Sequence, residues 1–209
     1  MQRRYRIAAF WVTLAVACPA LADQIKLTDG TEVSGTVLQR EGDRVIVELP
    51  RTSVQAVNGQ PLPPPVVEGA PAPAFEAKDL AGQPQQVAGE GPVTLVQFWA
   101  SWCGFCRSDL PTVKQVFSTY HGKGLRIVAV SIDDDKDALQ RFVQKEQIPY
   151  IVVAAKDYPA IPDQFETRGI PTYFLIDRHG TIARIWRGSV TATKTNLGQA
   201  VAALLANPA

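Results

Sequence analysis

Two cysteines separated by two residues, Cys103 and Cys106, lie where an apolar run gives way to a segment with helical spacing. The apolar run, residues 93–98, predicts a buried strand, and the spacing of apolar residues in 104–120 predicts a helix. Cysteines at positions i and i+3 of a first helical turn lie about 5 to 6 Å apart at Cβ, so a small adjustment joins them. The chain must therefore fold so that one turn, between a strand and a helix, holds either a dithiol or a disulfide.

The beginning of that helix favours one of the two sulfurs as a nucleophile. Unpaired backbone N–H groups and the positive end of the helix dipole stabilise an anion, here the thiolate of Cys103. Cysteines in such sites have pKa values below that of a free cysteine. We therefore expect Cys103 to attack a disulfide and the deeper Cys106 to resolve the resulting mixed disulfide.

Three other interpretations of the cysteine pair fit the sequence less well. A zinc site needs a cluster of ligands, but His121 and His179 form no local cluster and no second pair with this spacing exists. A purely structural disulfide across four residues would constrain little of the unfolded chain. Two inert buried thiols are disfavoured, because a glycine and flanking tryptophans accompany the pair at a helix start. We therefore expect no metal and no cofactor here.

The composition bounds the rest of the chain. A length of 209 residues, with 46% hydrophobic and 20% charged content, is enough for one ordinary core and a smaller unit. The formal net charge is +1 and no basic patch is present, so we expect no nucleic acid partner.

The first 22 residues have the pattern of a secretory signal peptide. Three arginines within the first six residues precede an apolar stretch of 11 residues, 7–17, and Ala20-Leu21-Ala22 forms a small-x-small cleavage site. A membrane span needs about 20 apolar residues, so this stretch is short for one. We expect export to the periplasm with cleavage after Ala22.

A lipoprotein is the alternative outcome of this leader. Residues 14–18 also resemble the bacterial box that directs acylation to Cys18. The protein would therefore associate with a membrane only if Cys18 is acylated or the leader is retained.

Residues 23–58 predict a small all-β unit. Apolar and polar residues alternate, Asp29-Gly30 is typical of a hairpin turn, and residues 41–43 mark a second turn. The spacing favours an SH3-like or Sm-like arrangement. A unit of this size rarely has a sufficient core, so we expect it to dock on the larger domain, self-associate or bind a partner. Residues 59–73 carry six prolines, which predicts an extended linker.

From residue 74 to residue 209, predicted strands and helices alternate. The strands are residues 93–98, 125–132, 150–155, 172–177 and 181–187, and the helices are residues 104–120, 138–147, 161–168 and 195–206. Strands joined by helices indicate parallel βαβ crossovers, and the tight turn at residues 178–180 adds an antiparallel edge. The predicted fold class is α/β.

Several motifs of this region resemble the thioredoxin-like superfamily, and within it exported thiol:disulfide oxidoreductases of the TlpA/ResA type. They are FWASWCGFC at residues 98–106, DLP at 109–111, residues 169–172, and FLIDRHGTI at 174–182 with the later Gly188. The resemblance implies a thioredoxin-like fold, a mixed central sheet flanked by helices, preceded here by the small antiparallel β unit. It also implies a protein-disulfide oxidoreductase whose redox-active disulfide joins Cys103 and Cys106, beside Trp102 of the motif.

The same resemblance assigns supporting residues around the pair. Pro171 should follow a cis peptide bond and pack beside the disulfide. The backbone of Ile170 would then be exposed beside Cys103 and able to pair with an extended segment of a partner. Thioredoxins hold a buried aspartate where this chain has Gln97, so that proton acceptor is missing.

Asp109 takes the place of an acidic residue that TlpA/ResA-type proteins have three positions after the second cysteine. Two roles for it stay open. It accepts or relays the proton of Cys106, or it only complements the helix dipole in the first turns.

The resemblance implies a reductase for disulfides of exported proteins with cysteine pairs, with cytochrome c maturation as one setting. An electron donor in the inner membrane would restore the dithiol. Two alternatives stay open. One is an oxidase that donates its disulfide, because the dipeptide Gly104-Phe105 does not reveal the redox direction. The other is a non-catalytic module that uses the pair to hold a metal or to act as a chaperone.

Overall fold

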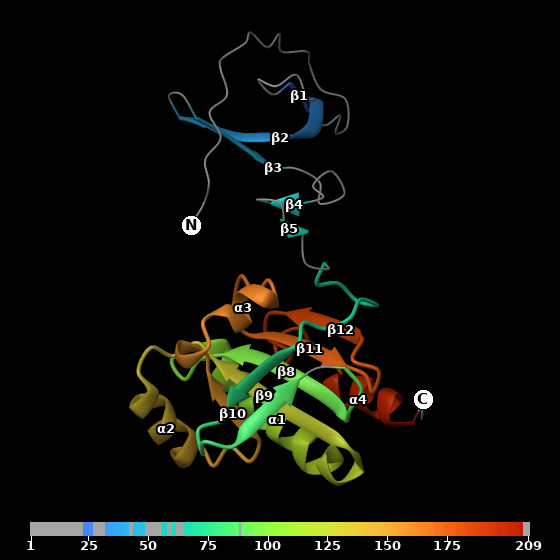
Figure 1. Cartoon of the computed structure of the whole chain (residues 1–209). Helices are drawn as coiled ribbons and strands as arrows, with labels where there is room; N and C mark the ends of the chain where they lie inside the picture. The colour runs from blue at the N-terminus through green and yellow to red at the C-terminus, as the bar shows by residue number, and fades with distance from the viewer. Residues whose placement is uncertain are drawn as a thin grey trace. The chain divides into compact units, whose positions relative to one another are not determined.

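The computed structural model describes residues 23–26, 32–41, 44–48, 56–57, 60–61, 65–87 and 89–206. The chain forms two compact units, Met1–Pro63 and Pro64–Ala209 (Figure 1). The predicted leader, with Cys18 and the cleavage site after Ala22, lies outside the described residues, and so does the predicted Asp29-Gly30 turn. Among the residues that are described, no helix is long and apolar enough to cross a membrane.

The first unit contains short antiparallel strands. β1 (Asp23–Lys26), β2 (Glu32–Glu41) and β3 (Arg44–Glu48) form a sheet in that order, and β4 (Ala56–Val57) pairs with β5 (Gln60–Pro61). Ile25 pairs with Val33, and Val37 pairs with Val47, so the alternating apolar positions meet across the strands. The predicted small antiparallel β unit is confirmed, whereas its likeness to SH3 or Sm folds stays a prediction.

A five-stranded mixed sheet forms the centre of the second unit. In spatial order its strands are β10 (Ile151–Ala154), β9 (Leu125–Ser131), β8 (Val93–Trp99), β11 (Thr172–Ile176) and β12 (Ile182–Arg187). β8, β9 and β10 run parallel, and β11 is antiparallel to both β8 and β12. Every residue of β8 is buried, because the strand is covered on both faces.

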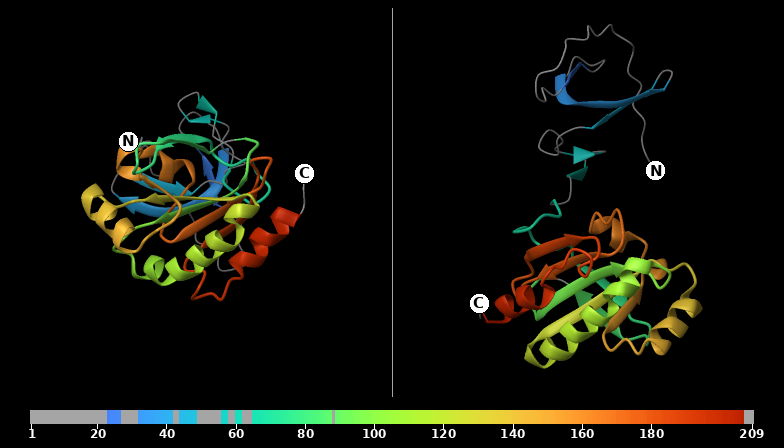
Figure 2. Two further views of the ribbon diagram at one scale, coloured as in Figure 1. Left: turned by 90° about the horizontal axis from the view of Figure 1, so that it is seen from below. Right: turned by 180° about the vertical axis from the view of Figure 1, so that it is seen from behind.

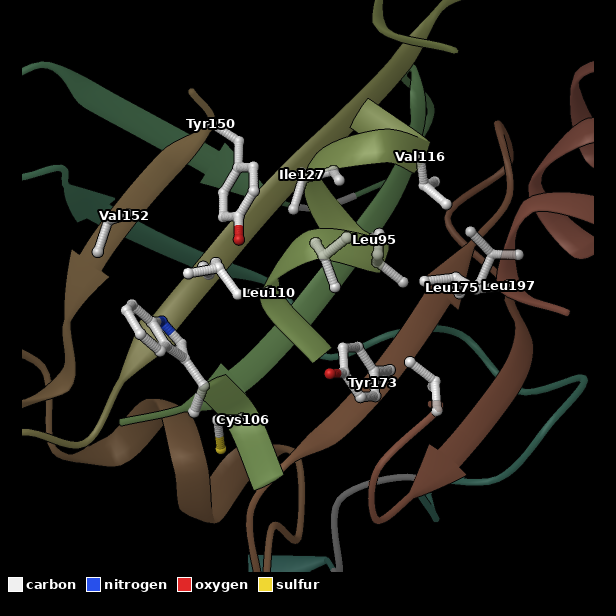
Figure 3. Close-up of a cluster of buried hydrophobic side chains, with 14 of the residues drawn as sticks. Leu95, Cys106, Leu110, Val116, Ile127, Tyr150, Val152, Tyr173, Leu175 and Leu197 are labelled. Carbon is white, nitrogen blue, oxygen red and sulfur yellow. The ribbon is translucent and has the colours of Figure 1, made fainter. Parts of the chain in front are cut away.

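Helices pack around this sheet. They are α1 (Gly104–Tyr120), α2 (Lys136–Lys145), α3 (Ala160–Gln164) and α4 (Leu197–Ala206). α1 and α4 lie side by side (Figure 2), and Leu95 of β8 shares one buried cluster with residues of both helices (Figure 3). Phe98, on the opposite face of β8, packs against Phe165 and Phe174. The predicted α/β class is confirmed.

A hairpin of β6 (Phe75–Lys78) and β7 (Pro84–Val87) precedes the sheet, and the sequence pattern did not indicate it. Each strand has only four residues. Phe75, Ala77 and Val87 are buried, which is too few apolar positions to stand out as alternation. The hairpin contributes to the core on the side of the sheet that holds Phe98.

The second half of the predicted linker lies along the edge strand β12. The N–H of Gly69 donates to the carbonyl of Ile182 (2.8 Å), and the N–H of Ile182 donates to the carbonyl of Ala70 (2.9 Å). Val66 is buried in the same core as the hairpin. The prolines do not prevent these contacts, because non-proline residues between them supply the N–H groups.

Candidate active site

Cys103 and Cys106 form a disulfide at the N-terminus of α1, with their Cα atoms 5.2 Å apart. Cys103 is the N-cap residue of the helix, and its sulfur accepts a hydrogen bond from the backbone N–H of Cys106 (3.2 Å). The sulfur of Cys103 thus lies where the first helical turn presents unpaired N–H groups. This geometry favours negative charge on that sulfur.

The two cysteine residues differ slightly in burial. Cys103 is 7% exposed and Cys106 is 1% exposed, within the cluster that packs α1 on the sheet (Figure 3). The side chains of Trp102 and Phe105, by contrast, are 64% and 65% exposed. Two large exposed apolar residues therefore lie within two positions of Cys103 along the chain.

Pro171 lies at the same end of the sheet. The Ile170–Pro171 peptide bond is cis, as the motif predicts. Thr172, the first residue of β11, pairs with Phe98 near the end of β8, directly before the turn that leads to Cys103. Pro171 is buried and Ile170 is half-buried. The carbonyl of Pro171 accepts the N–H of Gly188 (2.8 Å), which holds it to the end of β12.

Asp109 is fully buried one helical turn after Cys106 and accepts four hydrogen bonds. Its Oδ1 accepts from the Ser189 hydroxyl (2.6 Å) and the Thr191 N–H (3.0 Å). Its Oδ2 accepts from the Tyr173 hydroxyl (2.7 Å) and the Val190 N–H (3.0 Å). A carboxylate offers about four lone-pair sites, so all are engaged.

These donors keep Asp109 ionised. Burial raises the pKa of the carboxyl, but the hydrogen bonds from Ser189, Tyr173 and Thr191 outweigh it and hold the pKa below its ordinary value. Burial, together with the neighbouring Asp109, raises the pKa of Tyr173. The predicted relay of a proton from Cys106 would therefore first need one of the four hydrogen bonds to open. The carboxylate also ties α1 to β11 and to the segment after β12.

Gln97 extends this network to β8. Its side chain is 2% exposed, and its Nε2 donates to the Tyr173 hydroxyl (3.4 Å), whose own proton goes to Asp109. The Gln97 side chain is neutral, so this buried position of β8 offers no carboxylate as a proton acceptor.

The sequence motifs include Asp109 but not Tyr173 or Ser189, whose hydroxyl groups donate to it. They lie 64 and 80 residues further along the chain, and no local pattern marks them. The motifs do not include Asp133 either. It is buried at the end of β9 and bonds to Ser101 in the turn before Cys103.

The two histidines do not gather at the disulfide. His121 lies at the C-terminal end of α1, where it stacks on Phe117 with ring centroids 4.6 Å apart. His179 lies in the turn between β11 and β12. Within the part of the chain that the structure describes, no group of three or more His, Cys, Asp or Glu residues could hold a metal ion.

A mixed sheet with a disulfide at the start of the helix that follows its central strand defines a thiol–disulfide oxidoreductase of thioredoxin-like fold. Residues 67–203 match the Redoxin family model, so the chain belongs to the Redoxin family. Within it, the similarities below and the motifs around the disulfide make it a protein-disulfide oxidoreductase of the TlpA/ResA type.

The relatives agree with this assignment. The chain is 26% identical to the thiol-disulfide oxidoreductase ResA of Geobacillus kaustophilus over 127 residues, which cover 60% of this chain and 72% of the relative. It is 27% identical to ResA of Bacillus subtilis over 127 residues, covering 60% and 70%. A solved structure of a candidate thiol:disulfide interchange protein DsbE from Chlorobium tepidum is 31% identical, with a TM-score of 0.62. It covers 66% of this chain and 98% of that chain.

Proposed function

We propose that this protein is exported and reduces disulfides in partner proteins outside the cytoplasm, with Cys103 as the attacking thiol and Cys106 as the resolving thiol. The observation that carries the proposal is the position of Cys103. Cys103 is the more exposed residue of the two, and its sulfur accepts the N–H of Cys106 at the N-cap of α1. The leader pattern of residues 1–22 supports export. Cleavage after Ala22 would release the protein to the periplasm, and acylation of Cys18 would anchor it.

The cycle starts from the dithiol. The thiolate of Cys103 attacks one sulfur of a partner disulfide, and the other partner sulfur leaves as a thiolate that takes up a proton. Cys106 then loses its proton and attacks the Cys103 sulfur, which releases the second partner thiol. The partner gains two electrons and two protons, and this protein holds the Cys103–Cys106 disulfide. An electron donor in the inner membrane, acting through its own dithiol, restores the reduced form.

Partner binding follows from the surface beside the disulfide. The exposed Trp102 and Phe105, within two residues of Cys103 in the chain, offer apolar contact, and the backbone of Ile170 can pair with an extended partner segment. This arrangement suits an unfolded or loosely folded chain with a cysteine pair. Exported proteins with cysteine pairs, including apocytochrome c, are such partners.

The first experiment traps the partner. The Cys106→Ser variant should accumulate a mixed disulfide on Cys103, and the attached protein is identified by mass spectrometry. The Cys103→Ser variant is the matched control and should capture nothing and fail to reduce insulin. Insulin reduction by Cys103→Ser would overturn the assignment.

A second measurement decides the direction of the reaction. The Cys103–Cys106 couple is equilibrated with a glutathione buffer, and a reducing potential is expected. A strongly oxidising potential would instead identify an oxidase. Metal bound stoichiometrically to anaerobically purified protein would favour the metal-holding alternative.

A further inference from the structure

A second buried carboxylate lies next to the active-site turn. Asp133 lies two residues after the end of β9 and is 4% exposed. Its Oδ1 accepts from the Ser101 hydroxyl (2.5 Å). Its Oδ2 accepts from the Ser101 backbone N–H (2.8 Å) and from the Ser131 hydroxyl (2.5 Å). Three donors therefore hold it, and two of them belong to one residue of the turn.

The turn that it holds leads directly to Cys103. β8 ends at Trp99, and Trp99 pairs with Ser131 of β9 in parallel register. The carbonyl of Trp99 accepts the N–H of Ile132 (2.9 Å), which continues the pairing beyond the strand. The chain then turns, and the N–H of Cys103 donates to the carbonyl of Ala100 (3.2 Å). Ser101 lies inside this turn, two residues before Cys103.

Asp133 accepts hydrogen bonds from both the backbone and the side chain of Ser101. These two bonds fix the conformation of the turn at its midpoint. The next residues place the Cys103 sulfur at the N-cap of α1, against the N–H of Cys106. No hydrogen bond joins Asp133 to either cysteine. Any effect of Asp133 on the position of the sulfur therefore passes through Ser101.

We propose that Asp133 is a positioning residue, which holds the 100–103 turn through Ser101 so that the Cys103 sulfur meets the N-terminal N–H groups of α1. The proposal rests on the proposed function in one respect, that Cys103 is the attacking thiol. Nothing in the motifs assigns a role to Asp133.

If Asp133 acts by positioning the turn, replacing it should change the pKa of Cys103 in one direction. If it acts only through its charge, the pKa should change in the other direction. A carboxylate near a thiolate disfavours the thiolate, so removing its charge alone would lower the pKa of Cys103. A looser turn would move the sulfur away from the helix N–H groups, which would raise that pKa. The sign of the change therefore separates the two effects.

The test measures the alkylation rate of Cys103 by iodoacetamide against pH in the reduced full chain, with the modified peptide quantified by mass spectrometry. Asp133→Asn removes the charge and disturbs the hydrogen bonds that Ser101 donates to this position. Ser101→Ala keeps the charge and removes one of the three hydrogen bonds. Asp134→Asn is the matched control, because it removes an exposed charge one residue away and leaves Ser101 and Asp133 intact.

Asp133→Asn should raise the pKa of Cys103 by about half a unit to one unit, which slows alkylation about threefold to tenfold at pH values below that pKa. Ser101→Ala should shift it in the same direction by less, and Asp134→Asn should leave it unchanged. A lowered pKa in Asp133→Asn, or no change, would overturn the proposal. If Asp133→Asn does not fold, as judged by circular dichroism, Ser101→Ala decides, and an unchanged pH profile in that variant refutes the proposal.

Failure of this inference is distinguishable from failure of the proposed function. The trapping experiment with Cys106→Ser reports whether Cys103 attacks partners at all. The pH profiles report only how its thiolate is placed.

Discussion

Two buried carboxylates, Asp133 and Asp109, bind residues near the active-site turn and helix, and their partners come from different parts of the chain. Asp133 binds residues that are 2 and 32 positions away, all at the adjoining ends of β8 and β9. Asp109 binds residues 64 to 82 positions away, on β11 and after β12. The first therefore holds the turn before Cys103. The second holds the side of the site where Pro171 opens β11.

The two networks also differ in the backbone groups that they satisfy. Asp109 accepts two backbone N–H groups, from Val190 and Thr191, whereas Asp133 accepts one, from Ser101. A serine hydroxyl can rotate to another acceptor when a carboxylate is lost, but a buried N–H cannot. We therefore expect Asp109 to contribute more to stability and Asp133 to contribute more to the reactivity of Cys103.

The largest effect is expected for Asp109→Ala. Loss of a buried acceptor with four donors should lower the free energy of unfolding by about 3 to 5 kcal/mol, measured by urea denaturation. Asp133→Ala should cost less, about 2 kcal/mol. The exposed Asp134→Ala serves as control and should stay within about 0.5 kcal/mol of the parent. Equal costs for Asp109→Ala and Asp133→Ala would remove the distinction between the two carboxylates.

A smaller loss is expected for Tyr173→Phe. This change removes the hydroxyl that donates to Asp109 and accepts from Gln97, while the ring still fills the core. The free energy of unfolding should fall by about 1 to 2 kcal/mol. A double-mutant cycle with Asp109→Asn should show coupling between the two positions, and additive losses would mean that the hydrogen bond contributes little.

The sequence predicted the parts of this site that are close together along the chain. The disulfide spacing, the helix after it and the cis bond before Pro171 are each carried by a local motif, and the structure agrees with them. The long apolar strands were also predicted to within a few residues, because a fully buried strand reads as a continuous apolar run. The four-residue strands of the β6–β7 hairpin were not.

The residues Asp133, Asp134 and Asp135 show why the rest was not predictable. In the sequence they form one acidic run at the end of a strand. In the structure Asp133 is buried on Ser101, Asp134 is exposed, and Asp135 is the N-cap of α2, accepting the N–H of Ala138 (2.9 Å). Only the register of β9 on β8 decides which of the three meets the active-site turn. That register is a property of the folded sheet.

The pH dependence of stability offers a test of the Asp109 network alone. The pKa of Asp109 in the folded protein lies below its ordinary value of 3.8, so the unfolded chain binds this proton at the higher pH. The stability that the carboxylate contributes is therefore complete above the unfolded pKa and is lost as the pH falls through the folded pKa. Asp109→Asn should lose less stability between about pH 5 and pH 2, with a difference in slope of at most about 1.4 kcal/mol per pH unit. If the free energy of unfolding fell equally steeply with pH in the parent and in Asp109→Asn, this expectation would be wrong.

The smallest effects come from the two serines, and they separate the networks most cleanly. Ser189→Ala removes the hydroxyl that donates to Asp109, and Ser101→Ala removes the hydroxyl that donates to Asp133. Each should cost about 1 kcal/mol of unfolding free energy. Only Ser101→Ala should slow the alkylation of Cys103, because only Ser101 lies in the turn that places this sulfur. If Ser189→Ala slowed the alkylation of Cys103 as much as Ser101→Ala does, the two carboxylates would act on this thiol as one connected network. The loss of reactivity would then follow the loss of stability and not the position of the serine.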